Sequence, residues 1–406
     1  MQDRAPARVA CLGNYARKTG LIGRPKNFAP LHQIKLAKCG ACGKVRPMTD
    51  TSNLPTLPSQ PTNVDWPNGD WPTGTATTAN HVALGDLLDH AFSDPNGDGK
   101  GPDDMGPTHA FVAIQGGKLV SEAYAEGYGP TQTYPSWSMA KSMLQALIGI
   151  AVRDGKMSIF DRVGAPEWPA GDPRAELTFD QLLRMASGLE FDENYVDGDI
   201  SDTISMLFGE GKADVAHYAA DKPLIHPIDS VFNYSSGTTN ILVRALSTVL
   251  GDGEPLSAQD FEAFMRTELL DPIGVTHAVP KFDGVGTWIG SSYCFMTARD
   301  FARFGLLYLR GGWWGDRQIL PNGWVDYART QSKVPTGDDE FMGYGAHWWL
   351  EIAGPGTFSC NGYGGQYIVL VPEKDLILVR HGDSHDVQGD GVKRWIKDVA
   401  DCFAVA

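Results

Sequence analysis

The sequence lacks any long run of apolar residues. No stretch approaches the ~20 consecutive apolar residues that a membrane-spanning helix needs. The basic residues near the N-terminus are not followed by an apolar stretch either, so we expect no signal peptide. These absences predict a protein with no membrane partner, and we expect it in the cytoplasm.

Basic residues are also scarce relative to acidic ones. Lys and Arg number 34 against 49 Asp and Glu, which gives a net charge of -15. Such a chain would repel a phosphate backbone or an anionic membrane, so we expect no nucleic-acid partner. Hydrophobic residues make up 42% and charged residues 20%, which excludes disorder, collagen and coiled coil as the main architecture. A folded protein that binds a small neutral or cationic molecule fits this composition.

Cysteine is too rare for a disulfide framework, with six in 406 residues. Cys39 and Cys42 have the C-x-x-C spacing of half a zinc site or a redox dithiol, but no second Cys/His pair follows at ligand distance. Residues 94–99 (Asp-Pro-Asn-Gly-Asp-Gly) resemble the start of a calcium loop, yet Met105 stands where the bidentate Glu should be. A plain loop and a polar turn are the favoured interpretations, so we expect no metal and no cofactor.

The sequence pattern changes along the chain, and the length predicts two or three structural units. Residues 1–80 are rich in Pro, Gly, Thr and Asn and predict an extended N-terminal arm. Apolar periodicity then predicts helices at 81–90, 138–153, 179–185, 239–250, 258–270 and 392–403, and strands at 110–114, 118–124, 344–352, 366–371 and 376–380.

The order of these elements predicts an α+β fold. Strands lie near both ends of the chain, and residues 161–275 contain only helical patterns. We therefore expect one antiparallel sheet flanked by helices, built from residues 81–160 and 276–406. The segment 161–275 is predicted to be an inserted helical subdomain.

A possible nucleophile lies at the start of the helix predicted for 138–153. Ser138 and Lys141 are spaced i, i+3, which puts both side chains on one face of a helix. A lysine desolvated among apolar neighbours could lose its charge and accept the serine proton. Equally, Ser138 could cap the helix while Lys141 extends to solvent. The residues alone leave the two interpretations open.

Two further segments could contribute to a site with Ser138. Tyr234 precedes two serines at the start of a predicted helix, where it could move a proton if a cation such as Lys141 lies nearby. Residues 360–366 (Cys-Asn-Gly-Tyr-Gly-Gly-Gln) lead into a strand, and their glycines permit close approach of a ligand or only a turn. The sequence contains no G-x-S-x-G, H-E-x-x-H or Walker A string, which disfavours other hydrolase and NTPase classes.

The ordered set S-M-A-K at 138, Y-S-S at 234 and G-Y-G-G-Q at 362 resembles the serine β-lactamase-related hydrolases. This group includes class C β-lactamases, D-alanyl-D-alanine carboxypeptidases, family VIII esterases and 6-aminohexanoate-dimer hydrolases. The resemblance covers roughly residues 80–406. Segments 182–195 and 291–305 are most similar to the 6-aminohexanoate-dimer (nylon oligomer) hydrolases.

This resemblance implies a β-lactamase-like fold and a role for each matching residue. Ser138 would be the acylated nucleophile, Lys141 its proton acceptor and Tyr234 the general acid/base. Backbone N–H groups of Ser138 and Tyr363 would form the oxyanion hole, with Gly362 letting the strand pass close to the acyl carbon. Tyr195 resembles a tyrosine that contacts the substrate amide, although simple packing beside Phe191 is an equal alternative.

Departures from the family pattern restrict the predicted activity. Ser236 replaces the usual Asn of the second motif, and Cys360-Asn361-Gly362 replaces Lys-Thr-Gly. A cation for a β-lactam carboxylate is therefore missing, unless Arg380 supplies one. We expect a serine hydrolase, a carboxylesterase or amidase, that acts on a small-molecule ester or amide, including nylon-oligomer-like amides. A D-aminoacyl peptidase, a weak β-lactamase and a penicillin-binding-like protein without turnover are the alternatives, and a homodimer is left open.

Overall fold

The computed structural model describes residues 54–194, 200–336 and 343–405. The chain divides into two compact units, 1–46 and 47–406, and all the described residues belong to the second. Cys39, Cys42 and most of the predicted arm therefore lie outside the described residues. The described part of the arm, 54–80, contains isolated bridges but no helix. Its Trp71 is buried, and the indole N–H donates to the carbonyl of Arg299.

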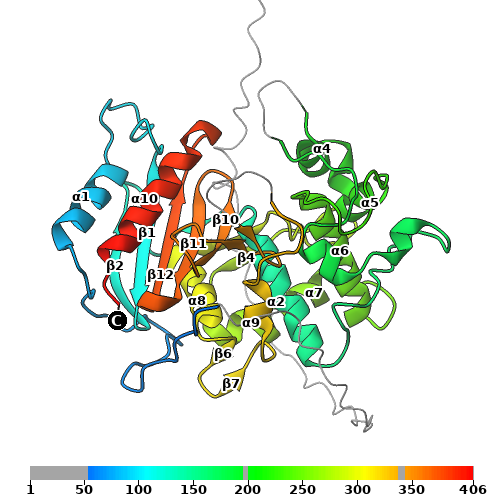
Figure 1. Cartoon of the computed structure of the whole chain (residues 1–406), viewed down its shortest axis with the longest axis horizontal. Helices are drawn as coiled ribbons and strands as arrows, with labels where there is room; N and C mark the ends of the chain where they lie inside the picture. The colour runs from blue at the N-terminus through cyan, green and yellow to red at the C-terminus, as the bar shows by residue number, and fades with distance from the viewer. Residues whose placement is uncertain (1–53, 195–199, 337–342, 406) are drawn as a thin grey trace, which may run out of the picture. The chain divides into compact units, whose positions relative to one another are not determined.

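An antiparallel sheet of seven strands forms the centre of this unit (Figure 1). Its order joins the N-terminal hairpin directly to the C-terminal strands, because β1 pairs with β12 along its whole length. In spatial order the strands are β2 (Lys118–Tyr124), β1 (Thr108–Gln115), β12 (Leu376–Gly382), β11 (Gln366–Val371), β10 (Phe358–Gly362), β9 (Trp349–Leu350) and β8 (Gly343–Tyr344).

Both faces of this sheet are covered by helices, so its central strands are buried and mostly apolar. Alternate residues of β1 point to opposite faces: Phe111 packs against Trp395 of α10 (Gly389–Cys402), and Val112 belongs to the cluster on the other face. Helix α1 (His81–Ala91) lies beside α10, while α8 (Ala298–Leu309) and α2 (Met139–Arg153) lie on the opposite face. This arrangement confirms the predicted α+β fold of an antiparallel sheet between helices.

Helices dominate the segment between the two sheet-forming parts. Only isolated bridges occur among its described residues. The helices are α3 (Phe179–Leu183), α4 (Asp202–Phe208), α5 (Val215–Ala220), α6 (Ser236–Leu250), α7 (Ala258–Met265), and short turns at Pro173–Glu176, Glu210–Ala213, Arg266–Leu270 and Asp271–Ile273. The smaller elements that follow or flank it are β3 (Thr133–Tyr134), β4 (Ala278–Pro280), β5 (Cys294–Thr297), β6 (Trp313–Trp314), β7 (Arg317–Gln318), α9 (Trp324–Ala328), and turns at Pro372–Lys374 and Asp386–Gln388.

The strand predicted for 344–352 is wrong. Two short strands, β8 and β9, occur there, and a turn separates them. His347 in this turn has a φ of 54°, a left-handed conformation that interrupts a regular strand. Its ring lies behind the helix that carries Lys141, where Nδ1 is 3.0 Å from the Lys141 carbonyl oxygen. The local tertiary contact therefore overrides the apolar alternation of the sequence.

The segment that resembles a calcium loop forms a polar turn. The Asp94 carboxylate accepts a hydrogen bond from the backbone N–H of Gly99 at 2.9 Å, and Asp98 pairs with Lys100. No group of three or more His, Cys, Asp or Glu side chains able to hold a metal occurs among the described residues.

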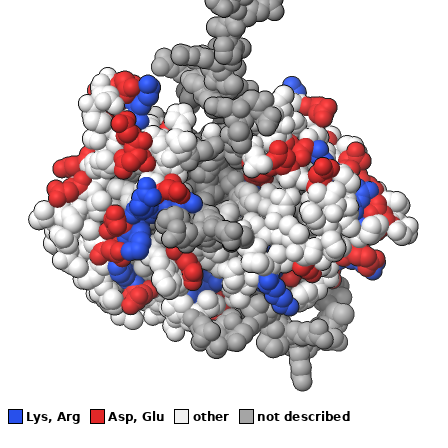
Figure 2. Space-filling model, turned by 45° about the horizontal axis from the view of Figure 1, so that its top comes forward, with Lys and Arg blue, Asp and Glu red and all other residues white. Residues whose placement is uncertain are grey.

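Within the same residues, no helix is long and apolar enough to cross a membrane. Acidic side chains lie on both sides of the face in Figure 2, interspersed with basic ones.

Candidate active site

Ser138 lies at the N-terminus of the buried helix α2. The preceding residue, Trp137, has a φ of 43°, an uncommon left-handed conformation for a bulky residue that sharply redirects the chain before the helix. Ser138 occupies the N-cap position, but its side chain makes no capping hydrogen bond. The alternative in which Ser138 serves only as a helix cap is therefore not what the structure contains.

Lys141 lies one helical turn after Ser138 and does not extend to solvent. The residue is 1% exposed. Its Nζ donates hydrogen bonds to Ser138 Oγ at 2.9 Å, to Ser236 Oγ at 2.9 Å and to the Ser291 carbonyl oxygen at 3.2 Å. The i, i+3 spacing thus brings the amine into contact with the hydroxyl, as the sequence predicts.

Burial changes the acidity of this amine. Desolvation lowers the pKa of Lys141 from 10.5 to about 8, while the carboxylate of Glu193 acts in the opposite direction. At pH 8 about half of the lysine side chains are neutral, and the neutral fraction grows as the pH rises. Only the neutral amine can accept a proton from Ser138.

Glu193 also belongs to this site, although the sequence does not predict it. Its carboxylate lies 3.8 Å from Lys141 Nζ, and its side chain is 8% exposed. Ser236, the first residue of α6, donates its hydroxyl to Glu193 at 2.7 Å and its backbone N–H to the same carboxylate. The string Asp-Glu-Asn-Tyr at 192–195 lies in a segment that resembles the nylon-oligomer hydrolases, but the resemblance implies a role there for Tyr195 alone.

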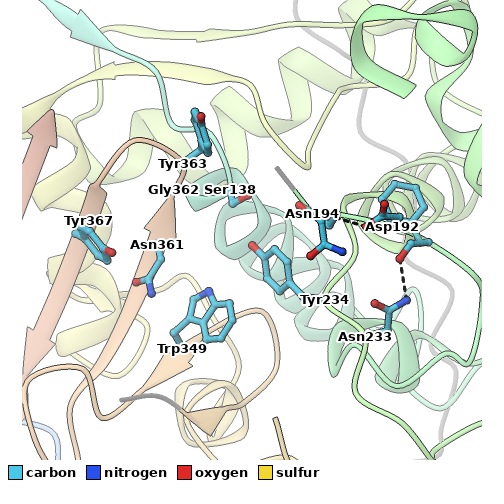
Figure 3. A pocket seen from close by; sticks show the side chains of 12 residues that line it. Ser138, Asp192, Asn194, Asn233, Tyr234, Trp349, Asn361, Gly362, Tyr363 and Tyr367 are labelled. Atoms are coloured by element: carbon cyan, nitrogen blue, oxygen red, sulfur yellow. Dashed lines mark hydrogen bonds between the residues drawn. The ribbon is translucent and has the colours of Figure 1, made fainter. Parts of the chain in front are cut away.

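Tyr234 lines the same pocket as Ser138, and its hydroxyl points toward the serine (Figure 3). Its ring packs against Trp349 and Tyr344 and lies 4.8 Å from Lys141 Nζ. Although the side chain keeps partial exposure to the pocket, burial raises the pKa of Tyr234 well above its usual value of 10, and hydrogen bonding with Ser138 opposes this rise. The phenol is therefore protonated at neutral pH.

The glycine-rich turn after β10 reaches the same point. A Cβ at Gly362 would lie 2.5 Å from the Ser136 carbonyl oxygen and 3.2 Å from Trp137 Cβ. Gly362 therefore permits close approach of two backbone segments, rather than of a ligand alone. This approach brings Tyr363 to the pocket beside Ser138, and its side chain, 39% exposed, packs edge-on against Trp137.

Arg380 does not supply a cation to the pocket. It is 1% exposed and lies behind the glycine-rich turn, where its guanidinium donates to the Gly365 carbonyl oxygen at 2.8 Å. Gln366 holds the same turn by donating to the carbonyl oxygens of Tyr363 and Gly364. Cys360 is also buried, and burial raises the pKa of its thiol, so it is neutral.

The pocket at Ser138 has a volume of about 460 Å³. Two carboxylates line it, Asp192 and Glu193, and no Lys or Arg is among its described lining residues. Tyr195 lies outside the described residues, so its predicted contact with substrate stays a prediction. The lining residues are Ser138, Phe191, Asp192, Glu193, Asn194, Asn233, Tyr234, Trp349, Asn361, Gly362, Tyr363 and Tyr367.

Known proteins share this fold. A 6-aminohexanoate-dimer hydrolase of Paenarthrobacter ureafaciens is 24% identical over 304 residues, which cover 67% of this chain and 72% of that protein. The structure of a candidate 6-aminohexanoate-dimer hydrolase from Bacillus anthracis superposes with a TM-score of 0.65 at 20% identity, covering 86% of this chain and 90% of that one. A penicillin-binding protein from Bacillus halodurans gives a TM-score of 0.54 at 17% identity, covering 71% and 96%.

The sequence model of one family matches most of the described unit. The Beta-lactamase family model covers residues 102–396, a range that contains Ser138, Lys141, Tyr234 and Tyr363. This range begins just before β1, the first strand of the chain, and ends within α10, the last helix. The resemblance found in the sequence is thereby confirmed, and the chain belongs to the Beta-lactamase family.

Proposed function

We propose that this protein is a serine hydrolase that cleaves a small ester or amide through an acyl-enzyme intermediate. One observation carries the proposal: the buried amine of Lys141 contacts Ser138 Oγ at 2.9 Å, at the floor of a pocket large enough for a small molecule. A serine hydroxyl becomes a useful nucleophile when a positioned base takes its proton. Burial gives Lys141 the lowered pKa that this task needs.

In the acylation step, the Ser138 proton moves to neutral Lys141 as Oγ bonds to the carbonyl carbon of the substrate. The electron pair of the carbonyl moves to its oxygen, and backbone N–H groups of Ser138 and Tyr363 would stabilise that charge. When the tetrahedral intermediate collapses, the protonated phenol of Tyr234 gives a proton to the departing oxygen or nitrogen. The ammonium of Lys141 then returns a proton to Tyr234.

In the deacylation step, a water molecule attacks the acyl carbon. Its proton passes to the Tyr234 and Lys141 pair, and Ser138 Oγ regains a proton as the acid product leaves. Each group ends in the protonation state in which it began. The groups named in these two steps account for every proton without a metal or an organic cofactor.

The pocket supports a substrate that is neutral or carries an amino group. Asp192 and Glu193 are the charged groups among the described lining residues, and Trp349 and Tyr367 offer aromatic surface to an aliphatic chain or a cation. Such a pocket repels a carboxylate placed near Ser138. We therefore favour short esters and amides with an amino group, such as the 6-aminohexanoate dimer, the substrate in the name of the Paenarthrobacter relative, whose carboxylate lies at the other end of the molecule from its amino group. The cytoplasmic location stays a prediction.

The proposal is tested by incubating the purified protein with p-nitrophenyl butyrate, 6-aminohexanoate dimer and a fluorophosphonate probe. We expect hydrolysis of the ester or the dimer, and attachment of one phosphonyl group at Ser138, located by peptide mass spectrometry. Attachment at Ser138 without turnover of either substrate would favour the penicillin-binding-like alternative. Turnover of a substrate by Ser138→Ala at the wild-type rate would refute the proposal.

A further inference from the structure

A chain of hydrogen bonds extends from the nucleophile to a carboxylate. Lys141 Nζ contacts Ser138 Oγ and Ser236 Oγ, each at 2.9 Å, and Ser236 Oγ donates to Glu193 at 2.7 Å. The second carboxylate oxygen of Glu193 accepts the backbone N–H of Ser236 at the start of α6. The carboxylate is therefore fixed at a helix N-terminus, where a negative charge is stabilised.

The proposed reaction forms a positive charge on Lys141, a side chain that is buried from water. When Lys141 takes the Ser138 proton, an ammonium forms on a side chain that is 1% exposed. A desolvated ammonium is unstable unless an anion or hydrogen-bond acceptors compensate for the lost water. The stability of this ammonium enters the barrier of the acylation step directly.

Glu193 is the carboxylate that faces this amine among the described residues. The other titratable groups packed around Lys141 and Glu193 cannot take its place. His347, whose Nδ1 meets the Lys141 carbonyl oxygen, is neutral because burial lowers its pKa to about 3. Tyr234 and Tyr344 are protonated phenols, because burial raises the pKa of each.

We propose that Glu193 is a positioning residue for the reaction: through Ser236 and by its charge, it orients Lys141 and stabilises the ammonium formed when Lys141 accepts the Ser138 proton. This inference rests on the proposed function. No proton needs to reach Glu193 in either step. Ser236 keeps its own proton and serves as the bridge, accepting from Lys141 and donating to Glu193.

The pH dependence of kcat/KM separates this role from a merely structural one. In the wild type the rate rises with pH as Lys141 becomes neutral, with a midpoint near its pKa of about 8. Replacing Glu193 by Gln removes the charge that favours the ammonium, so the midpoint moves to lower pH by about one unit or more. At the high-pH plateau kcat/KM falls at least about ten-fold, because the ammonium is less stable in the transition state.

Two variants make the test specific. Glu193→Asp keeps the charge, so its midpoint returns to within about 0.5 unit of the wild-type value, and it also covers the case in which Glu193→Gln does not fold. Asp192→Asn removes the neighbouring charge of the same pocket. The Asp192 side chain accepts from the Asn194 backbone N–H, and the carboxylate that pairs with Lys141 is that of Glu193, so we expect the midpoint of Asp192→Asn to move by less than about 0.3 unit.

The possible failures are distinguishable. An unchanged midpoint in folded Glu193→Gln, in a protein whose wild type hydrolyses the ester, overturns this inference and leaves the proposed function intact. An equal shift in Asp192→Asn also overturns it, because the effect would then be one of general pocket charge. Absence of both ester turnover and phosphonate labelling at Ser138 in the wild type refutes the proposed function itself.

Discussion

Two buried cations, Lys141 and Arg380, have different surroundings. Lys141 lies beside a nucleophile and a carboxylate, whereas Arg380 donates to neutral oxygens of Thr108, Met105, Pro107, Gly365 and Ser384. Burial lowers the pKa of Lys141 to about 8 but that of Arg380 only to about 10. Lysine can therefore titrate near neutral pH, while arginine stays charged.

The different pKa values of the two groups indicate which buried cation can act as a base. A lysine desolvated next to a hydroxyl can act as a base, because its neutral form is accessible. An arginine with several donors in a fixed plane is suited to hold backbone carbonyl oxygens in place. We interpret Lys141 as the reactive group and Arg380 as the clamp that holds the turn carrying Tyr363.

The largest expected effect concerns the group that Lys141 activates. Replacing Ser138 by Ala should lower ester hydrolysis by about 10⁴-fold or more, because Ser138 lines the pocket, whereas Ser236, the other serine whose hydroxyl contacts the amine, is buried and donates to Glu193. Steady-state kinetics measure the loss, and thermal unfolding serves as the folding control. Substantial residual turnover would mean that Ser138 is not the nucleophile.

Exchanging the type of cation at position 141 tests the comparison directly. Lys141→Arg keeps the charge but cannot be deprotonated, so we expect a loss of about 10³-fold or more in kcat/KM. Lys141→Met, of similar volume and without charge, is the matched control and should be equally inactive. An active Arg variant would show that a fixed cation suffices, and the distinction between the two sites would disappear.

Substrate choice depends on Arg380 being absent from the pocket. A charge-assisted hydrogen bond to the carboxylate of a β-lactam contributes ~1.5 to 3 kcal/mol, about 10- to 150-fold in binding. With no described Lys or Arg lining the pocket, nitrocefin should be hydrolysed about 100-fold less efficiently than p-nitrophenyl butyrate. Measuring both on one preparation tests this. Nitrocefin turnover equal to ester turnover would mean that a cation grips the carboxylate.

The smallest expected effect comes from weakening the clamp. Arg380→Lys loses donors to several carbonyl oxygens, so we expect about 2 to 3 kcal/mol less unfolding free energy and about a ten-fold lower kcat. The pH midpoint should stay near that of the wild type, because Lys141 is untouched. Arg310→Lys, at a buried arginine paired with Asp375, is the control: it should destabilise without lowering kcat. Equal losses of kcat in both variants would contradict the clamp.

The sequence predicts much of the fold because its longer elements have clear periodicity. The hairpin of β1 and β2, strand β11 and helix α2 lie within two residues of their predicted positions. The sequence does not predict short elements such as α4 and α5, since six or seven residues contain too little periodic signal. The broken strand at His347 was missed because its turn is stabilised by distant contacts.

The candidate site likewise contains contacts that the sequence predicts and contacts that it does not. Ser138 and Lys141 are neighbours on one helix, so their contact follows from spacing alone. Glu193 contacts Lys141 from a loop 52 residues away in the sequence. Arg380 lies on β12 and contacts Gly365, directly before the neighbouring strand β11. Neither contact can be predicted from residues that are close together in the sequence. A resemblance could place Tyr234 and Tyr363 in the pocket, but it could not reveal which buried charge faces which.

The pH dependence of kcat/KM in the wild-type protein tests the central claim most directly, that Lys141 is the base for Ser138. Burial lowers its pKa to about 8, and the neutral form is the active one, so activity must rise with pH. We expect a single ionisation with a midpoint near 8 and about 90-fold lower kcat/KM at pH 6 than at pH 9. A profile that is flat from pH 6 to 9, or that falls as the pH rises through 8, would contradict the account.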